Sequence, residues 1–396
     1  MRRALGVASA LAAARVAAAS PDVIGGSDAP PGMWPDAAAI LFSGTMECSG
    51  VLVAPTVVLT AGHCADPALG PQPDHVRVGA SSLTGSDGET LAVATATVFP
   101  SYATTTDLTV LVLATAAREQ PRAIATGWGS AAIVDGAPVE LVGYGAIDAD
   151  GSDFVPALQQ AQTTITDATC AHEPGCSAGA MPAGELGAGG SGVDTCPGDS
   201  GGPMYLPTPF GTFVAGLTAR AYATAQTACG GGGIYERPDH VVDWIELAAG
   251  GAVARGPEAS VDAPIELARG GSGAVVTIAA NDPVSARHRF AIAAQPAHGT
   301  AAVHDDGALH VCASGSYAGS DAVAVRITDA GASGRAITAT FPIAIADRDD
   351  AGTCDAADFD GASDGGCCDA GAGGSPAASI SLGLAALALA RARRRR

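Results

Sequence analysis

Short runs of apolar and β-branched residues alternate with turn-forming residues over most of the chain. Between residue 23 and about residue 249, Gly, Pro, Asp and Ser separate these runs, which is typical of β-strands joined by tight turns. Regularly spaced short strands of this kind predict a sandwich or a barrel. The only clear helical pattern in this part covers residues 241–247. Strands are expected at residues 51–60, 76–79, 91–98, 108–113, 139–143 and 213–217.

A second block with the same pattern begins after Arg255-Gly256-Pro257 and runs to about residue 346. Its expected strands include residues 274–278, 322–327 and 336–345. Residues 295–329, with a Pro-Ala-His-Gly-Thr turn and a later Gly-Ser-Asp before the run that starts at Ala322, resemble bacterial cadherin-like or immunoglobulin-like surface repeats. The resemblance implies a β-sandwich accessory domain at 257–346, in which Cys312 has no evident partner. Residues 347–374 are rich in Asp, Gly, Ala and Ser, which predicts a flexible acidic stalk.

Both ends of the chain carry apolar segments. Arg2 and Arg3 precede an apolar stretch, and small residues up to Ala19 supply a cleavage site, so residues 1–19 are expected to be a signal peptide that directs export. At the other end, residues 377–390 are apolar and an Arg cluster follows them. As a helix this run would span roughly 21 Å, which is short of a hydrocarbon core of roughly 30 Å.

The order of Cys367-Cys368, a short apolar helix and an Arg cluster resembles the C-terminal sorting segments of myxobacterial surface proteins. The resemblance implies processing near the cysteines and a protein that ends at the cell surface. An ordinary tail anchor is the alternative. In both cases residues 375–396 are expected to form an apolar helix with an Arg tail that contacts the membrane, and whether this tail is cleaved stays open.

Composition limits the classes of function. The 396 residues suffice for two or three domains, and a hydrophobic content of 47% argues against intrinsic disorder. With 40 acidic residues against 20 basic ones, the formal charge is -20, which argues against a nucleic-acid partner because no basic field faces phosphates. Ten cysteines suit an oxidising compartment. The oligomeric state is not indicated.

Two motifs carry candidate catalytic residues. Residues 59–64 read Leu-Thr-Ala-Gly-His-Cys, and residues 196–203 read Cys-Pro-Gly-Asp-Ser-Gly-Gly-Pro. A hydroxyl nucleophile needs a base beside it, and an imidazole base needs a carboxylate that fixes its tautomer. The order His63, Asp107, Ser200 resembles that of the chymotrypsin-like, trypsin-type serine proteases, over about 225 residues. This implies an all-β protease domain of two barrels at 23–250.

The resemblance implies a role for each of these residues. Ser200 would be the nucleophile, His63 the general acid and base, and Asp107 the orienting carboxylate. The backbone N–H groups of Gly198 and Ser200 would form the oxyanion hole. The expected activity is that of a serine endopeptidase, the expected partners are protein or peptide substrates, and no cofactor is expected.

Activation follows from the start of the matched region. Val23-Ile24-Gly25-Gly26 matches the mature N-terminus of the family, whose new amino group pairs with the carboxylate before the nucleophile, here Asp199. We therefore expect a cut before Val23, which makes residues 20–22 a short propeptide. Asp22 precedes the cut instead of Arg or Lys. Either a separate activating protease cleaves there, or removal of the signal peptide leaves residues 20–22 to be trimmed.

Substrate preference depends on Asp194, which lies where trypsin-like members carry the acid of the specificity pocket. A buried carboxylate without a partner is costly, so an Arg or Lys side chain of the substrate would supply the missing charge. Thr195 lies beside this acid, and Gly233 would leave one wall of the pocket open. An exposed loop Asp with another preference is the alternative.

The other wall of the pocket departs from the family. Ala219-Arg220-Ala221 replaces the usual Ser-Trp-Gly. Ala221 should narrow the entrance, and Arg220 places a positive charge near the substrate path. This change and the missing tryptic activation site leave open an alternative function, namely a catalytically inactive homologue that acts as a surface binding protein.

The cysteines agree with the same domain. The resemblance implies three disulfides, which are Cys48–Cys64, Cys170–Cys176 and Cys196–Cys229. Metal binding is not expected, because the cysteines do not cluster with histidines at zinc spacing. Residues 148–153 look like a fragment of a calcium loop that lacks the terminal Glu, so a solvated loop is expected there.

Overall fold

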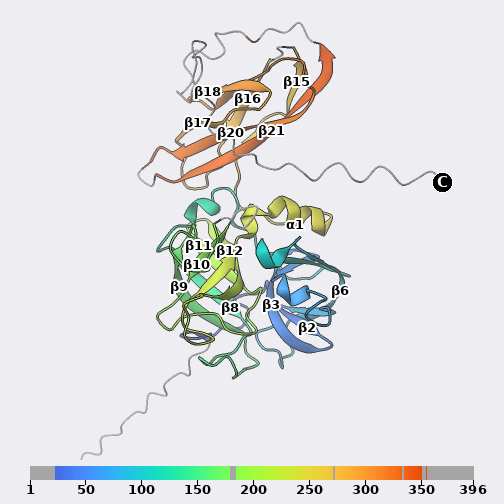
Figure 1. The fold of residues 1–396 in the computed structure, drawn as a ribbon, viewed down its shortest axis with the longest axis vertical. Coiled ribbons are helices and arrows are strands. Elements are labelled where there is room, and N and C mark those ends of the chain that lie inside the picture. Colours follow the sequence, from blue (N-terminus) through green and yellow to red (C-terminus); the bar gives the residue numbers. More distant parts are fainter. Residues whose placement is uncertain (1–22, 179–183, 271–272, 332–333, 350–353, 355–396) are drawn as a thin grey trace, which may run out of the picture.

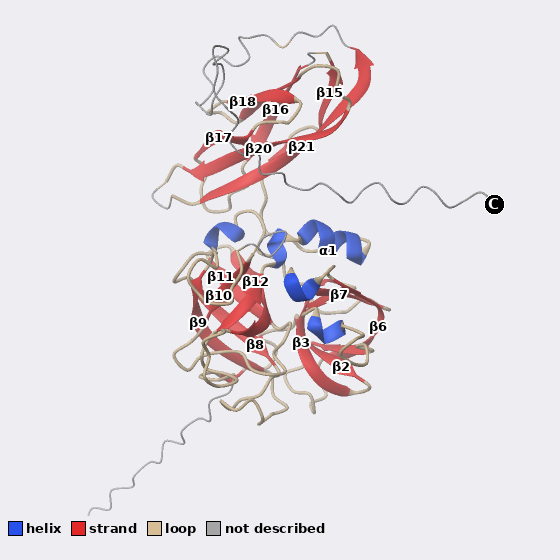
Figure 2. Ribbon diagram, viewed as in Figure 1, coloured by secondary structure: helices blue, strands red, loops and turns tan. Residues whose placement is uncertain are grey.

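A computed structural model describes residues 23–178, 184–270, 273–331, 334–349 and 354 of the chain, which form a protease-sized part with a second part above it (Figure 1). Strands dominate both parts and helices are few and short (Figure 2), so the expected all-β class is confirmed. The expected signal peptide, residues 20–22, Cys367-Cys368 and the C-terminal helix lie outside the described residues. Within the described ranges, no helix has the length and apolar character needed to cross a membrane.

The first barrel is closed by six strands in the order β2-β3-β4-β7-β6-β5. The run at residues 51–60, expected as one strand, is two antiparallel strands joined by a turn at Pro55 and Thr56. Pro55 has no N–H for a strand ladder, which explains the break. The strands are β2 (Ala37–Phe42), β3 (Thr45–Ala54), β4 (Val57–Thr60), β5 (His75–Val78), β6 (Glu89–Val98) and β7 (Thr109–Leu113).

The second barrel belongs to a seven-stranded sheet in the order β1-β9-β10-β13-β12-β11-β8, and the additional β9–β8 pairing closes six of these strands into a ring. The expected helix follows as α1 (Val242–Ala249), which ends where Gly250 takes a φ of 69°. The strands are β1 (Ser27–Asp28), β8 (Pro138–Gly143), β9 (Gln159–Asp167), β10 (Glu185–Ala188), β11 (Pro203–Thr208), β12 (Gly211–Ala221) and β13 (Gly233–Glu236).

Contacts between the barrels place the candidate motifs side by side. The Ser49 amide of β3 donates to the carbonyl of Ser200 at 2.9 Å, and the Ser49 hydroxyl donates to the carbonyl of Gly198 at 2.9 Å. Elsewhere in the barrel interface, the buried carboxylate of Asp36 accepts hydrogen bonds from Arg122 and from the hydroxyl of Tyr205, both at 2.6 Å. The loop of Ser200 is therefore held against the barrel that carries His63.

The second part consists of two four-stranded sheets, β14-β16-β19-β18 and β15-β21-β20-β17, around a shared apolar core. Its immunoglobulin-like or cadherin-like kinship stays a prediction. The strands are β14 (Ser260–Val261), β15 (Ile265–Arg269), β16 (Gly273–Ala279), β17 (His288–Ala294), β18 (Gly299–Val303), β19 (Ala308–Ala313), β20 (Gly319–Asp329) and β21 (Ala336–Asp349).

The end of this part differs from the expected stalk. Strand β21 continues to Asp349, where Arg269 of β15 forms ion pairs with Asp347 at 2.7 Å and Asp349 at 2.9 Å. These pairs hold residues 347–349 in the sheet although the segment is acidic. Cys312 forms a disulfide with Cys354, which lies outside the block at 257–346.

One aromatic residue of the part that contains the two barrels is inserted into the second part. Trp128 is fully buried and packs in the core of the two sheets. Its indole Nε1–H donates to the carbonyl of Ala280 at 2.6 Å, and the Arg335 guanidinium lies 5.2 Å from the ring centroid. The two parts are therefore joined by packing as well as by the chain.

Candidate active site

His63 and Asp107 form the first half of the candidate site. His63 begins the short helix η1 (His63–Ala65) directly after β4, and Asp107 lies just before β7, which pairs with β4. Asp107 Oδ2 lies 2.8 Å from His63 Nδ1, and Asp107 Oδ1 accepts the backbone N–H of His63 at 2.8 Å. With a proton on Nδ1 held by the carboxylate, Nε2 is the nitrogen left to accept a proton.

The glycine before the histidine makes this contact possible. A Cβ on Gly62 would lie 2.8 Å from Asp107 Oδ1 and 2.9 Å from two ring carbons of Tyr102. Such separations are too short for a side chain, so the carboxylate approaches the backbone of η1 only because residue 62 is glycine.

The loop of Ser200 lies in a tight turn before β11. Gly198 has a φ of 95° and Gly201 a φ of 77°, and a Cβ on Gly201 would overlap Thr60 and Ala61 of the other barrel. Neither the Gly198 nor the Ser200 amide donates a hydrogen bond to another described residue. Two free N–H groups beside a hydroxyl are what an oxyanion hole requires. In the uncut chain, the described residues include no hydrogen bond between the Ser200 hydroxyl and His63.

Asp199 is a fully buried carboxyl without a described cation beside it. It accepts the backbone N–H of Gly145 at 2.7 Å and that of Cys196 at 2.9 Å. Burial and the nearby charge of Asp194 together raise the pKa of Asp199 to about 7, although the hydrogen bonds from Cys196 and Gly145 lower it. The Val23 nitrogen is part of a peptide bond in this uncut chain, so the pairing of a free Val23 amino group with Asp199 stays a prediction.

Asp194 is also fully buried, at the position expected for the base of the specificity pocket. Its carboxylate accepts the backbone N–H groups of Thr195 at 2.8 Å, Gly232 at 2.9 Å and Gly230 at 3.1 Å. Burial raises the pKa of Asp194 to about 6 although these hydrogen bonds lower it. A Cβ on Gly233 would lie 3.2 Å from Asp194 Oδ1, so this glycine does border the acid. Ala221 is exposed at the end of β12.

The structure contains disulfides that join Cys48 to Cys64, Cys170 to Cys176 and Cys196 to Cys229. Two groups of side chains are close enough for a metal ion among the described residues, and both consist of such cysteines with His63 or Glu185. A sulfur in a disulfide is not a thiolate and is therefore a poor metal ligand.

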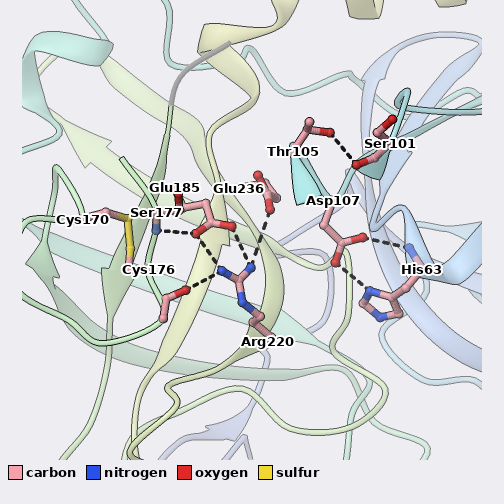
Figure 3. A network of polar contacts seen from close by, with 11 residues as sticks. His63, Ser101, Thr105, Asp107, Cys170, Cys176, Ser177, Glu185, Arg220 and Glu236 are labelled. Carbon is pink, nitrogen blue, oxygen red and sulfur yellow. Dashed lines mark hydrogen bonds and ion pairs between the residues drawn. A yellow bond between two sulfur atoms is a disulfide. The ribbon is translucent and has the colours of Figure 1, made fainter. Parts of the chain in front are cut away.

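Some residues near the site belong to no recognisable sequence motif. Arg220 was noted in the sequence, but its partners Glu185 of β10 and Glu236 of β13 were not (Figure 3). The available signal is a Glu at one end of an otherwise apolar strand, because charged residues are almost never fully buried unless they are paired. Gly143 and Gly145, which border Asp199, were missed as well, although the sequence Gly-Tyr-Gly directly after a strand marks them.

Comparisons with known proteins agree with this geometry. The family model described as Trypsin matches residues 23–245. Serine protease 56 of Mus musculus is 32% identical over 239 residues, which are 57% of this chain and 38% of that protein. A trypsin of Saccharopolyspora erythraea is 32% identical over 192 residues, which are 46% of this chain and 82% of that protein.

The chain thus spans about two fifths of the length of the first mammalian relatives, but most of the bacterial trypsin. Among solved structures, mouse neuropsin, a serine protease expressed in the limbic system of the brain, aligns with a TM-score of 0.46 and 25% identity, over 56% of this chain and 97% of that one. Because the family model matches more than half of the chain, the protein belongs to the trypsin family of chymotrypsin-like serine proteases.

Proposed function

We propose that the protein is an exported serine endopeptidase that hydrolyses peptide bonds after Arg or Lys. The observation that carries the proposal is the contact of Asp107 with both the ring and the backbone of His63. This contact orients the imidazole as a base, and the free N–H groups of Gly198 and Ser200 provide the oxyanion hole. The four disulfides fit an extracellular protein.

The proposed reaction proceeds through an acyl enzyme. The Ser200 hydroxyl attacks the scissile carbonyl carbon while its proton passes to His63 Nε2, and the Asp107 carboxylate stabilises the imidazolium. The imidazolium then gives this proton to the leaving amine. Water then attacks the acyl carbon while giving a proton to the same imidazole, and the imidazolium returns this proton to Ser200 as the ester bond breaks. Asp107 stays ionised throughout.

Preference for a basic residue is proposed from the burial of Asp194. Its carboxylate has only backbone N–H partners, and no described cation forms an ion pair with it. A guanidinium or ammonium group in the pocket would supply a counter-charge and stabilise the ionised form. Gly233 supports access to this carboxylate, because a side chain there would begin 3.2 Å from Asp194 Oδ1.

Activation by a cut before Val23 is part of the proposal. Asp199 is buried without a counter-ion in the uncut chain, and a free amino group on Val23 would supply one. Val23 also has a φ of 31°, which is unfavourable for a β-branched residue. A cut before Val23 would relieve this strain, because it removes the preceding peptide bond that defines this φ.

The test combines N-terminal sequencing of the exported protein with labelling by a fluorophosphonate probe. Cut protein should be labelled and should hydrolyse an Arg ester faster than a Leu ester, and Ser200→Ala should lose both labelling and hydrolysis. Retention of hydrolysis in Ser200→Ala would refute the assignment of the nucleophile.

A binding protein on an inactive protease fold is the second candidate. The missing hydrogen bond between Ser200 and His63 among the described residues favours it, together with the replacement of the usual Ser-Trp-Gly by Ala219-Arg220-Ala221. Protein that starts at Val23, stays unlabelled and hydrolyses neither ester would support this candidate.

A further inference from the structure

A cavity of about 290 Å³ lies beside the candidate triad and shares Asp107 with it. It is bordered by the segment before β7 and by strands β10, β12 and β13 (Figure 3). Three carboxyl groups and one guanidinium line it, so its chemistry is acidic. The lining residues that matter are Tyr102, Thr105, Asp107, Glu185, Arg220 and Glu236.

Arg220 does not leave a free positive charge in this cavity. Its Nη1 and Nη2 atoms donate to the two carboxylate oxygens of Glu185 at 2.7 and 2.8 Å, and Nη2 also donates to the carbonyl of Gly175 at 2.7 Å. A two-point ion pair with a buried carboxylate neutralises the guanidinium and fixes its plane. The positive charge of Arg220 is therefore already balanced by Glu185 and would attract an acidic ligand only weakly.

Glu236 is a buried carboxyl group whose oxygens have no hydrogen-bond partner among the described residues. Its side chain is only 1% exposed, and neither carboxylate oxygen accepts a hydrogen bond of normal geometry. The nearest cation is Arg220, whose Nη1 atom lies 4.0 Å from Glu236 Oε1. Burial and then repulsion by Glu185 raise the pKa of Glu236 to about 8, against a lowering by the backbone of Asp107. A buried carboxyl in this state is costly unless a donor reaches it.

We propose that this cavity is a second subsite for a basic side chain of the substrate, with Glu236 as the carboxylate that binds it. The inference rests on the proposed protease activity and adds a second basic residue to the one expected at Asp194. Arg220 is next to Ala221 at the pocket entrance, so a peptide that lies along Ala219–Ala221 can reach both places. A guanidinium or ammonium group would satisfy the oxygens that no described residue satisfies.

Discrimination at this subsite should increase with pH. The empty subsite holds Glu236 mainly protonated near neutral pH, because the carboxyl is buried, Glu185 and Asp107 face it, and the charge of Arg220 is shared with Glu185. Tyr102 is no competing base, since its hydroxyl donates to Asp66 and its pKa is raised to about 12. As the pH rises through about 8, the ionised Glu236 should bind a cation more strongly.

The experiment uses the full chain cut before Val23 and a set of peptides with Arg before the cleaved bond. At each of the three preceding positions, Arg is compared with citrulline, which has the same shape without the charge, and with Glu. We expect a preference for Arg over citrulline of about ten-fold in kcat/KM at one position. The preference should grow from pH 6 to pH 9.

Glu236→Gln tests the proposed residue and Glu140→Gln is its control, because Glu140 is a partly buried carboxyl on β8 whose pKa burial also raises. Glu236→Gln should remove the preference for the Arg peptide over the citrulline peptide, together with the pH dependence of that preference. Glu140→Gln should keep both. Binding of the same peptides to the Ser200→Ala protein, which should not cleave them, provides a second measurement of the preference.

The outcomes separate this inference from the proposed function. Equal hydrolysis of the Arg and citrulline peptides, or a preference for Glu, would overturn the subsite and leave the protease intact. Absence of hydrolysis combined with Glu236-dependent binding of the Arg peptide would overturn the protease and leave the subsite. A preference that survives in Glu236→Gln would also contradict the inference.

Discussion

Asp107 contacts His63 at two points, so its charge and its shape can be tested separately. Asp107→Asn keeps the shape but removes the charge, and the amide favours the wrong tautomer of the imidazole. We expect kcat of the cut protein to fall by about 10⁴-fold with little change in thermal stability. Asp153→Asn on an exposed loop is the control, measured with the same ester. A loss below ten-fold would contradict the orienting role.

The buried carboxyl of Asp199 makes stability depend on pH. Its pKa in the uncut chain is about 7, compared with an ordinary 3.8, so the folded state holds a proton that the unfolded state releases. The stabilisation is therefore present below about pH 4 and is lost as the pH rises through 7.

Urea unfolding of the uncut chain should show a loss of a few kcal/mol from pH 4.5 to 7.5, and Asp199→Asn should lessen this loss. The remaining loss belongs in part to Asp194, whose pKa is raised to about 6. A cut before Val23 should also lessen it, since the new ammonium group would pair with Asp199. An identical loss in Asp199→Asn would show that this carboxyl is not the cause.

At the scale of elements, the end of β8 shapes the cavity that holds Asp199. A Cβ on Gly145 would lie 2.5 Å from the carboxylate of Asp199, so Gly145→Ala should displace the Ser200 loop. We expect loss of most fluorophosphonate labelling and a destabilisation of about 1 to 3 kcal/mol. Gly251→Ala is the matched control, because no atom lies within 4 Å of its added Cβ. Equal labelling of both variants would contradict this role of Gly145.

Elements with a strong local pattern could be predicted from the sequence. Strands β6 and β8 contain the expected apolar runs, and β7 contains all of its expected run except the first residue, because a run of apolar and β-branched residues marks a strand locally. The pair β3 and β4 was expected as one strand because its apolar run crosses Pro55 without interruption. Strand β21 ran past its expected end, since Arg269, distant in sequence, pairs with its acidic residues.

The candidate site shows the same division at the scale of the whole molecule. His63, Asp107 and Ser200 could be found because each lies in a motif whose residues and order are characteristic. Glu185 and Glu236 belong to no such motif. Their importance depends on strands β10 and β13 pairing beside Arg220, which the sequence alone does not show. Trp128 likewise looks like any core residue, and only the folded chain shows that its core belongs to the second part.

The insertion of Trp128 predicts that the two parts unfold together. Trp128→Ala removes the buried ring, its hydrogen bond to Ala280 and its contact with Arg335. We expect a loss of about 3 to 5 kcal/mol and a change from one calorimetric transition to two. Trp244→Ala on α1 is the control, since the Trp244 ring packs against Phe99. This variant should weaken the protease part without separating the second part. Two transitions in the unchanged protein would show that packing at Trp128 does not couple the parts.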